Sequence, residues 1–468
     1  MSKGKPSRVE DSLLFVLPFT ANPARLDNPE LGLTRMLALA GRSAAHAAEV
    51  TVLDVSDHRL IRSGIELFHR VVDGRGDWRL RSRGWEPALS GDLTVPFAHG
   101  DLPGELADLV LPFRRRGTLG PIAAVSYQRQ TFEFRSDADD QPCGWLRDSK
   151  ATVRRGGVTT ARYREIVIEP GPAGLTLEQA DWLGGSLLAV GGTRVESFPS
   201  LAARLGTPAT GLSDYPEPRP VGPDSTFENF VESMLDGRLR ELIMADLAAR
   251  TDAPGADDLI EIVGGLRAEL TGLAPTLDPD WLAELTDELD WLVGALAETS
   301  GEPDRLQSLL RRERYLRLLD LLVTGSRAPK VDEERTDQAS AETLVWLLGE
   351  GVDRLLTTLR ELSPASRDAD WAAAARQAIG VRRLERVSRS VLPKRSRRTA
   401  KKLRPLAEQL IIARDAGESA AEAQRQSRFA TPAEAFDLGR VHEREQQRQH
   451  AAQQQFLQLW ADLSEKRR

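Results

Sequence analysis

The pattern of apolar and polar positions changes near residue 210 of the chain. Before it, short segments rich in Val, Leu, Tyr and Phe are separated by turns that contain Gly or Pro, as in EVTVLDV (49–55) and AAVSYQRQTFEFRS (123–136). Segments of this length and spacing are typical of β-strands. Two stretches among them, 103–116 and 176–188, have helical spacing instead. The first part is therefore predicted to be an antiparallel β domain.

The second part follows a segment rich in Pro and Gly, residues 211–226, and its pattern is helical almost to the end. In WLAELTDELDWLVGALAE (281–298) the apolar residues recur every three or four positions: Trp281, Leu285, Leu289, Leu292 and Leu296. This spacing predicts the apolar face of an amphipathic helix. The fold class is therefore predicted to be α+β, with an antiparallel sheet followed by an all-α helical bundle.

The composition is that of a globular protein, because 468 residues with 41% hydrophobic content suffice for two or three domains. The single cysteine, Cys143, excludes an intramolecular disulfide and a cysteine-based zinc site. The net charge of −7 argues against a general nucleic-acid binder. The run LLFVLPF (13–19) is too short for a membrane span and contains a proline, so it is predicted to be a strand. We expect a soluble cytoplasmic protein with neither a membrane partner nor a specific nucleic-acid partner.

Charge is unevenly distributed within the predicted bundle. Residues 252–304 contain fourteen acidic residues and one basic residue, Arg267, whereas residues 382–404 contain eleven basic residues and one acidic residue, Glu385. An anion is therefore expected to be repelled by one part of the bundle and attracted to the other.

The densest part of this basic stretch, KRSRRTAKKLR (394–404), is predicted to begin a helix with Pro393 as its first residue. A helix that starts there has four cations on one side, namely Lys394, Arg397, Lys401 and Arg404. Its apolar residues Ala400, Leu403 and Leu410 then face inward. Pro405 is expected to kink or restart the helix.

The order of these segments resembles a CYTH domain at 8–208, a linker at 209–226 and a CHAD domain at 227–465. VLDVSDHRLIRSGIELFHR (52–70) resembles the CYTH hairpin, and DWRLRSR (77–83) is similar to its Trp-x-Leu-Lys strand. RERYLRLLDLL (312–322) and the helix at 437–460 resemble the middle and closing helices of a CHAD domain. The resemblance implies an antiparallel β tunnel or half-barrel followed by a helical bundle.

Active CYTH domains hydrolyse triphosphates with Mg or Mn held by carboxylates in the tunnel. The resemblance implies a metal set of Glu10, Asp148, Glu165 and Glu169, and phosphate-binding cations Arg70, Arg81, Arg129 and Lys150. However, the signature Glu-x-Glu-x-Lys is reduced here to Glu10, Ser12 and Leu14. Metal-assisted hydrolysis needs several oxygen ligands on the ion. We therefore expect a non-catalytic protein without a cofactor, and a Mg- or Mn-dependent triphosphatase is the alternative.

CHAD domains are associated with polyphosphate through His and Arg on their helices, and these too are depleted. The helix at 256–270 retains Arg267, and its repeat at 371–385 retains Arg376 and Arg382. The resemblance and the charge density together favour inorganic polyphosphate or another polyanion as the partner. The candidate binding residues are Arg382, Arg383, Arg386, Arg389, Lys394, Arg395, Arg397, Arg398, Lys401, Lys402, Arg404 and His442.

Two other interpretations of the basic stretch stay open. Its cations could hold an acidic protein surface, including residues 252–304 of another copy, so that the chain acts as an interaction scaffold. Alternatively, they form a solvated helix face without a ligand.

Overall fold

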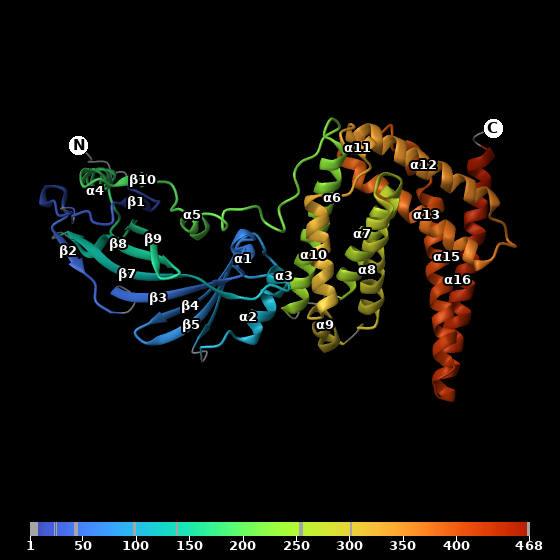
Figure 1. Ribbon diagram of the computed structural model, residues 1–468, viewed down its shortest axis with the longest axis horizontal. Helices are drawn as coiled ribbons and strands as arrows, with labels where there is room; N and C mark the ends of the chain where they lie inside the picture. The colour runs from blue at the N-terminus through green and yellow to red at the C-terminus, as the bar shows by residue number, and fades with distance from the viewer. Residues whose placement is uncertain are drawn as a thin grey trace. The chain divides into compact units, whose positions relative to one another are not determined.

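The computed structural model divides the chain into two compact units, with the boundary between Pro216 and Glu217 (Figure 1). It describes residues 8–465 except 23, 25, 42–44, 97–99, 137–138, 252–255 and 300–301. The first unit is built on an antiparallel sheet and the second is helical, so the predicted α+β class is confirmed.

The first unit contains one ten-stranded sheet in the order β10-β1-β9-β8-β7-β3-β4-β5-β6, with β2 paired to β7. The strands are β1 (Leu13–Leu17), β2 (Arg35–Ala38), β3 (Ala45–Asp54), β4 (Ile65–Val72), β5 (Arg75–Ser82), β6 (Asp92–Pro96), β7 (Gly120–Ser136), β8 (Asp139–Arg155), β9 (Val158–Pro170) and β10 (Thr193–Val195). The described strands form an open path, because β10 and β6 each pair on one side only.

The sheet carries a hydrophobic core on each face. On one face, Phe15, Phe134 and Ile168 pack with α4 (Leu177–Ala189), whose first turn is fixed by a capping box between Thr176 and Gln179. Val52, Val125 and Val153 belong to the core on the other face, together with residues around α5 (Leu201–Leu205). Burial on both faces explains why the long central strands contain so many Val, Ile, Tyr and Phe residues.

Four short helices complete the first unit: η1 (Pro29–Leu31), α1 (Arg59–Arg62), α2 (Gly104–Leu109) and α3 (Leu111–Arg114). The stretch predicted to be helical at 103–116 forms two short helices, because the chain breaks at Val110. Pro112 has no amide hydrogen for the preceding turn, so it begins α3 instead of continuing α2.

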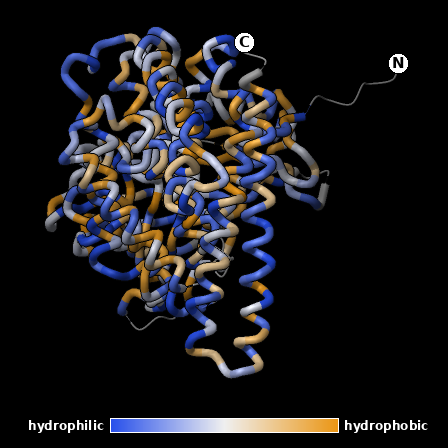
Figure 2. Tube along the Cα trace, turned by 90° about the vertical axis from the view of Figure 1, so that its right-hand side faces the viewer, coloured by the Kyte–Doolittle hydropathy of each residue, from blue (hydrophilic) through white to orange (hydrophobic). Residues whose placement is uncertain are grey.

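The second unit contains α6 (Phe227–Arg250), α7 (Ala256–Leu273), η2 (Ala274–Thr276), α8 (Pro279–Ala297), α9 (Pro303–Leu310), α10 (Glu313–Arg327), α11 (Glu333–Thr336), α12 (Ser340–Glu361), α13 (Asp368–Val387), η3 (Ser388–Ser390), α14 (Arg398–Lys402), α15 (Arg404–Ser427) and α16 (Pro432–Glu465). The predicted apolar face of α8 is buried along its whole length. The hairpin of α15 and α16 extends beyond the other helices of this unit (Figure 2). None of the described helices is long and apolar enough to cross a membrane.

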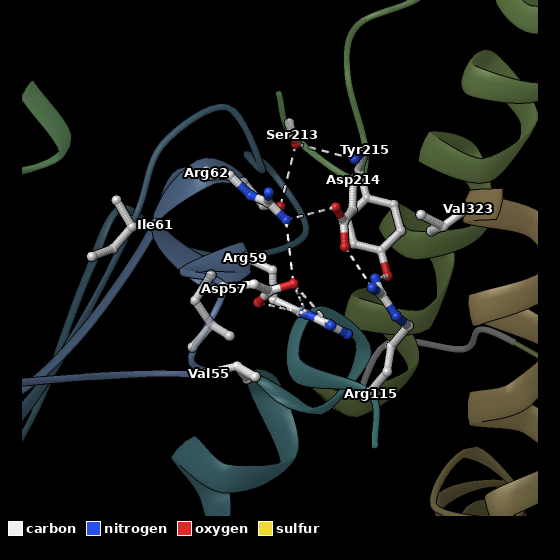
Figure 3. Close-up of polar contacts among 12 residues, drawn as sticks. Val55, Asp57, Arg59, Ile61, Arg62, Arg115, Ser213, Asp214, Tyr215 and Val323 are labelled. Atoms are coloured by element: carbon white, nitrogen blue, oxygen red, sulfur yellow. Dashed lines mark hydrogen bonds and ion pairs between the residues drawn. The ribbon is translucent and has the colours of Figure 1, made fainter. Parts of the chain in front are cut away.

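The predicted linker at 209–226 contains no helix or strand, but its first half belongs to the core of the first unit. Figure 3 shows Asp214 between two arginines: it accepts hydrogen bonds from Arg115 and, at 3.1 Å, from Arg62. The Tyr215 hydroxyl donates to the carbonyl of Pro112 and accepts from Arg115. The first unit therefore reaches Pro216, past the predicted domain end at 208.

An aromatic cluster surrounds this ion pair. The rings of Trp85, Phe113 and Tyr215 meet edge to face, with centroids 5.0 to 6.1 Å apart. Burial disfavours the charged form of Arg115, but Tyr215 and Asp214 outweigh this effect and raise the pKa of Arg115. The charged pair is stable in this apolar place because each partner neutralises the other.

We expect Asp214→Asn to lower the free energy of unfolding by about 3 kcal/mol, because it leaves the Arg115 charge buried without its carboxylate. Urea unfolding followed by tryptophan fluorescence measures the loss, and hydrogen exchange assigns it to residues 8–216. The matched control is Asp224→Asn, at an exposed aspartate of the same segment. A loss below about 1 kcal/mol would contradict the structural role of this pair.

Candidate functional site

The four carboxylates expected to bind a metal do not converge. The register of β8 and β9 pairs Asp148 with Ile166. Because paired residues share a face and successive residues alternate, Asp148 lies on the opposite face from Glu165 and Glu169. Glu10 precedes β1 and is exposed. Within the described residues, no group of three or more His, Cys, Asp or Glu could hold a metal ion.

Each of the three strand carboxylates instead accepts hydrogen bonds from an arginine: Asp148 from Arg164, Glu165 from Arg204 and Glu169 from Arg147. Burial raises the pKa of Glu165, although Arg204 acts in the other direction. A metal ion at any of these oxygens would have to displace a guanidinium group.

Three of the four cations expected in the tunnel share the sheet face of Glu165. They are Arg70, Arg81 and Arg129. Arg70 pairs with Asp77 at 2.7 Å, and Arg129 donates to the hydroxyl of Tyr127 at 2.8 Å. Lys150 lies on the opposite face, 6.0 Å from the centroid of the Phe19 ring. The expected phosphate-binding set is therefore divided between the two faces.

In the helical unit, the basic segment 382–404 is organised around its one acidic residue. Glu385 on α13 is only 3% exposed. Its carboxylate accepts hydrogen bonds from Arg397 at 2.8 Å and from Arg404 at 2.7 Å, and Arg389 lies 3.8 Å away. Arg397 also donates to the carbonyl of Leu392 at 3.2 Å. One buried carboxylate thus holds together the end of α13, the following turn and the start of α15.

This arrangement corrects the helix predicted for the basic segment. Residues 393–397 form turns, α14 begins only at Arg398, and a new helix begins at Arg404 with Pro405 in its first turn. Arg397 is buried, so it does not share an exposed side with Lys394 and Lys401. The inward positions are as predicted, since Ala400, Leu403 and Leu410 are buried. The predicted restart at Pro405 is also confirmed.

The remaining cations of the segment differ in exposure. Arg382 and Arg383 are half-buried, and Arg383 lies 3.9 Å from Glu261 on α7. Six others are exposed and form no ion pair with the part of the chain that the structure describes: Arg386, Lys394, Arg395, Arg398, Lys401 and Lys402. The segment therefore presents a group of positive charges that its own fold does not neutralise.

His442, predicted to join the polyanion site, lies elsewhere. Its Nδ1 is 2.8 Å from the carbonyl oxygen of Ala420, so the ring joins α16 to α15. Ala420 lies sixteen positions after Arg404 on the same helix, which corresponds to roughly 24 Å along the axis. The structure thus gives His442 a packing contact away from the basic segment.

Sequence reasoning missed a cavity of about 850 Å³ within the helical unit. Residues of α7, α8, α12, α13 and α15 line it, and five of them are arginines: Arg267, Arg354, Arg376, Arg383 and Arg414. The signal in the sequence is the glycines on facing helices, Gly264 and Gly272 on α7 and Gly380 on α13. Gly380 is far from the two glycines of α7 in the chain, so the sequence alone does not show that all three line one cavity.

Comparisons with known proteins add little to this description. No family model matches the chain, and no curated protein matches it. Among solved structures, PptA from Streptomyces chartreusis is similar to 51% of this chain over 100% of its own, with 21% sequence identity and a TM-score of 0.37. The function is therefore inferred from the residues of this chain.

Glu385 gives a pH-dependent expectation. Burial alone would raise its pKa, but the hydrogen bonds from Arg404 and Arg397 outweigh burial and hold the pKa below the usual value of a glutamate. Because the pKa is lowered on folding, the stabilisation is complete above the unfolded value of about 4.3 and is lost as the pH falls through the folded value. We expect Glu385→Gln to cost about 3 kcal/mol at neutral pH and progressively less below about pH 4.

Urea unfolding of both proteins across this pH range measures the difference. Glu408→Gln, at an exposed position on α15, is the matched control and should show no comparable loss. A difference that stays constant down to acid pH would show that the Glu385 carboxylate does not act through its charge.

Proposed function

We propose that this chain binds inorganic polyphosphate or a comparable linear polyanion through the basic segment 382–404, without catalysing a reaction on it. One observation carries the proposal: Glu385 engages Arg397 and Arg404, while six neighbouring cations stay exposed and unpaired within the described part of the chain. These six cations fall within residues 386–402 of a chain whose net charge is −7, so the positive charge is concentrated in one short stretch.

The chemistry of a polyanion fits this arrangement. Polyphosphate carries roughly one negative charge per repeat unit, so a row of cations can bind it without recognising a sequence, and the released counterions drive binding. The Glu385 hydrogen bonds fix the backbone that carries Lys394 and Arg398. Holding the backbone of the cations in place before binding lowers the entropy cost of ordering them on the ligand.

Binding is favoured over hydrolysis by the sheet of the first unit. A Mg- or Mn-dependent triphosphatase would need carboxylates that converge on the ion, whereas Asp148 and Glu165 lie on opposite faces and each is bound to an arginine. Arg70, Arg81 and Arg129 on one face could contact phosphate, but no group of three or more His, Cys, Asp or Glu among the described residues could hold a metal ion beside them.

We expect wild type to bind long-chain polyphosphate with strong salt dependence, and a variant without four exposed cations to bind at least about tenfold more weakly. The variant changes Lys394, Arg398, Lys401 and Lys402 to Ala and leaves Arg397 with Glu385. Four fewer phosphate contacts should reduce the slope of log K against log salt by about 3. Titration calorimetry across a salt series measures both quantities.

The control removes four exposed arginines from elsewhere in the helical unit: Arg312, Arg317, Arg360 and Arg428. An equal loss of affinity for polyphosphate in both variants would mean that net charge alone drives binding. No binding of polyphosphate by wild type would refute the proposal. If wild type instead shows a concentration-dependent mass that collapses in high salt without any phosphate, the cations serve a protein partner, such as the acidic surface of another copy.

A further inference from the structure

The cavity between α7 and α13 is large because small residues line it. Gly264, Ala268 and Gly272 on α7 face Ala373 and Gly380 on α13. At Gly264 and at Gly380 an added Cβ would meet no atom within 4 Å, so the space at these two positions is open. Its volume of about 850 Å³ is within the usual range of pockets that take organic ligands.

Two of the five arginines that line the cavity are neutralised by the fold. Arg267 donates to Asp290 at 2.8 Å, and Arg414 donates to Asp415 at 2.6 Å. These pairs leave their cations with little charge to offer a ligand.

The other three arginines are poorly neutralised. Arg383 lies 3.9 Å from Glu261, and burial together with the nearby Arg386 lowers the pKa of its guanidinium. Arg376 on α13 and Arg354 on α12 form no ion pair with any described carboxylate. Three arginines and one glutamate leave about two positive charges, which matches the charge of roughly −1.5 to −2 on a phosphate monoester at neutral pH.

The walls of the cavity differ from those expected for polyphosphate. Much of the lining is aliphatic: Ile260, Val293, Ile379, Val381 and Leu384. A chain of phosphates has no apolar part to place against these side chains, and it would lose water there without gaining a contact. An organic body would bury its apolar surface at the same place.

We propose that this cavity binds an organic phosphate monoester with an aromatic or aliphatic body. Arg376 and Arg354 hold the phosphate, and the body lies against the aliphatic lining of α7 and α13. Arg383 lines the cavity and also belongs to the basic segment, but the two arginines that hold the phosphate lie outside that segment and the ligand is different. This inference therefore does not rest on the polyanion function.

The test uses the full chain and 2-naphthyl phosphate, with binding measured by titration calorimetry. Gly380→Leu places a side chain in the open space and should weaken binding at least about tenfold. Leucine in place of glycine favours a helix, so the variant should fold, and circular dichroism checks this. The control is Gly294→Leu on α8, an exposed position outside the cavity lining where an added Cβ also meets nothing within 4 Å.

The charge requirement is tested separately. Arg376→Gln should weaken the binding of 2-naphthyl phosphate about tenfold, because it removes a charge-assisted contact without leaving a buried carboxylate unpaired. The control is Arg360→Gln, an exposed arginine of α12 that does not line the cavity. Uncharged 2-naphthol and inorganic phosphate should each bind more weakly than the ester, since each offers only half of the contacts.

Three results would overturn the proposal. They are no binding of 2-naphthyl phosphate by wild type, equal affinity of wild type and Gly380→Leu for it, or an affinity of wild type for inorganic phosphate as high as that for the ester. The variant with Lys394, Arg398, Lys401 and Lys402 changed to Ala should keep its affinity for 2-naphthyl phosphate. If that variant no longer binds polyphosphate but still binds the ester, both proposed sites are supported. If wild type binds only the ester, the polyanion proposal alone fails.

Discussion

The buried carboxylate of Glu385 fixes the most highly charged part of this protein. A carboxylate that is 3% exposed must be neutralised, and the nearest cations are those of the segment that follows it. Arg397 and Arg404 supply the charge from the two ends of the short helix α14. The backbone between them is thereby held against α13, and the cations that Glu385 does not use are left facing solvent.

The first unit uses the same interaction at its end. Asp214, 2% exposed, joins a segment without helix or strand to Arg115 and Arg62, which come from elements more than ninety-five positions earlier in the chain. In both units, an irregular stretch rich in Pro, Gly or basic residues becomes ordered because one acidic residue is buried among arginines. Composition therefore describes such stretches poorly, since their conformation depends on a single long-range pair.

Local patterns in the sequence predicted the strand at 123–136 and the buried face of 281–298, because side-chain period and turn residues act over a few positions. The placement of Asp148 and Glu165 could not be predicted in this way, since the β8–β9 register decides which face each occupies. Arg397 was placed on the exposed side because helical spacing carries no information about its partner, Glu385. Likewise, Gly264 and Gly380 line one cavity only because α7 packs on α13.

The glycines of the helical unit bear on what the cavity does. A glycine inside a helix costs about 1 kcal/mol relative to alanine. At Gly351 and at Gly272 an added Cβ would lie in ordinary van der Waals contact, 3.4 Å from Val381 and 3.6 Å from the carbonyl oxygen of Gly380. At Gly264 and Gly380 an added Cβ meets nothing within 4 Å, and both glycines line the cavity. Alanine would fit at both positions and favour the helices. The same holds for Gly294 on α8, so what distinguishes Gly264 and Gly380 is that they line the cavity, and substitution at Gly380 therefore tests the proposed ligand where substitution at Gly294 does not.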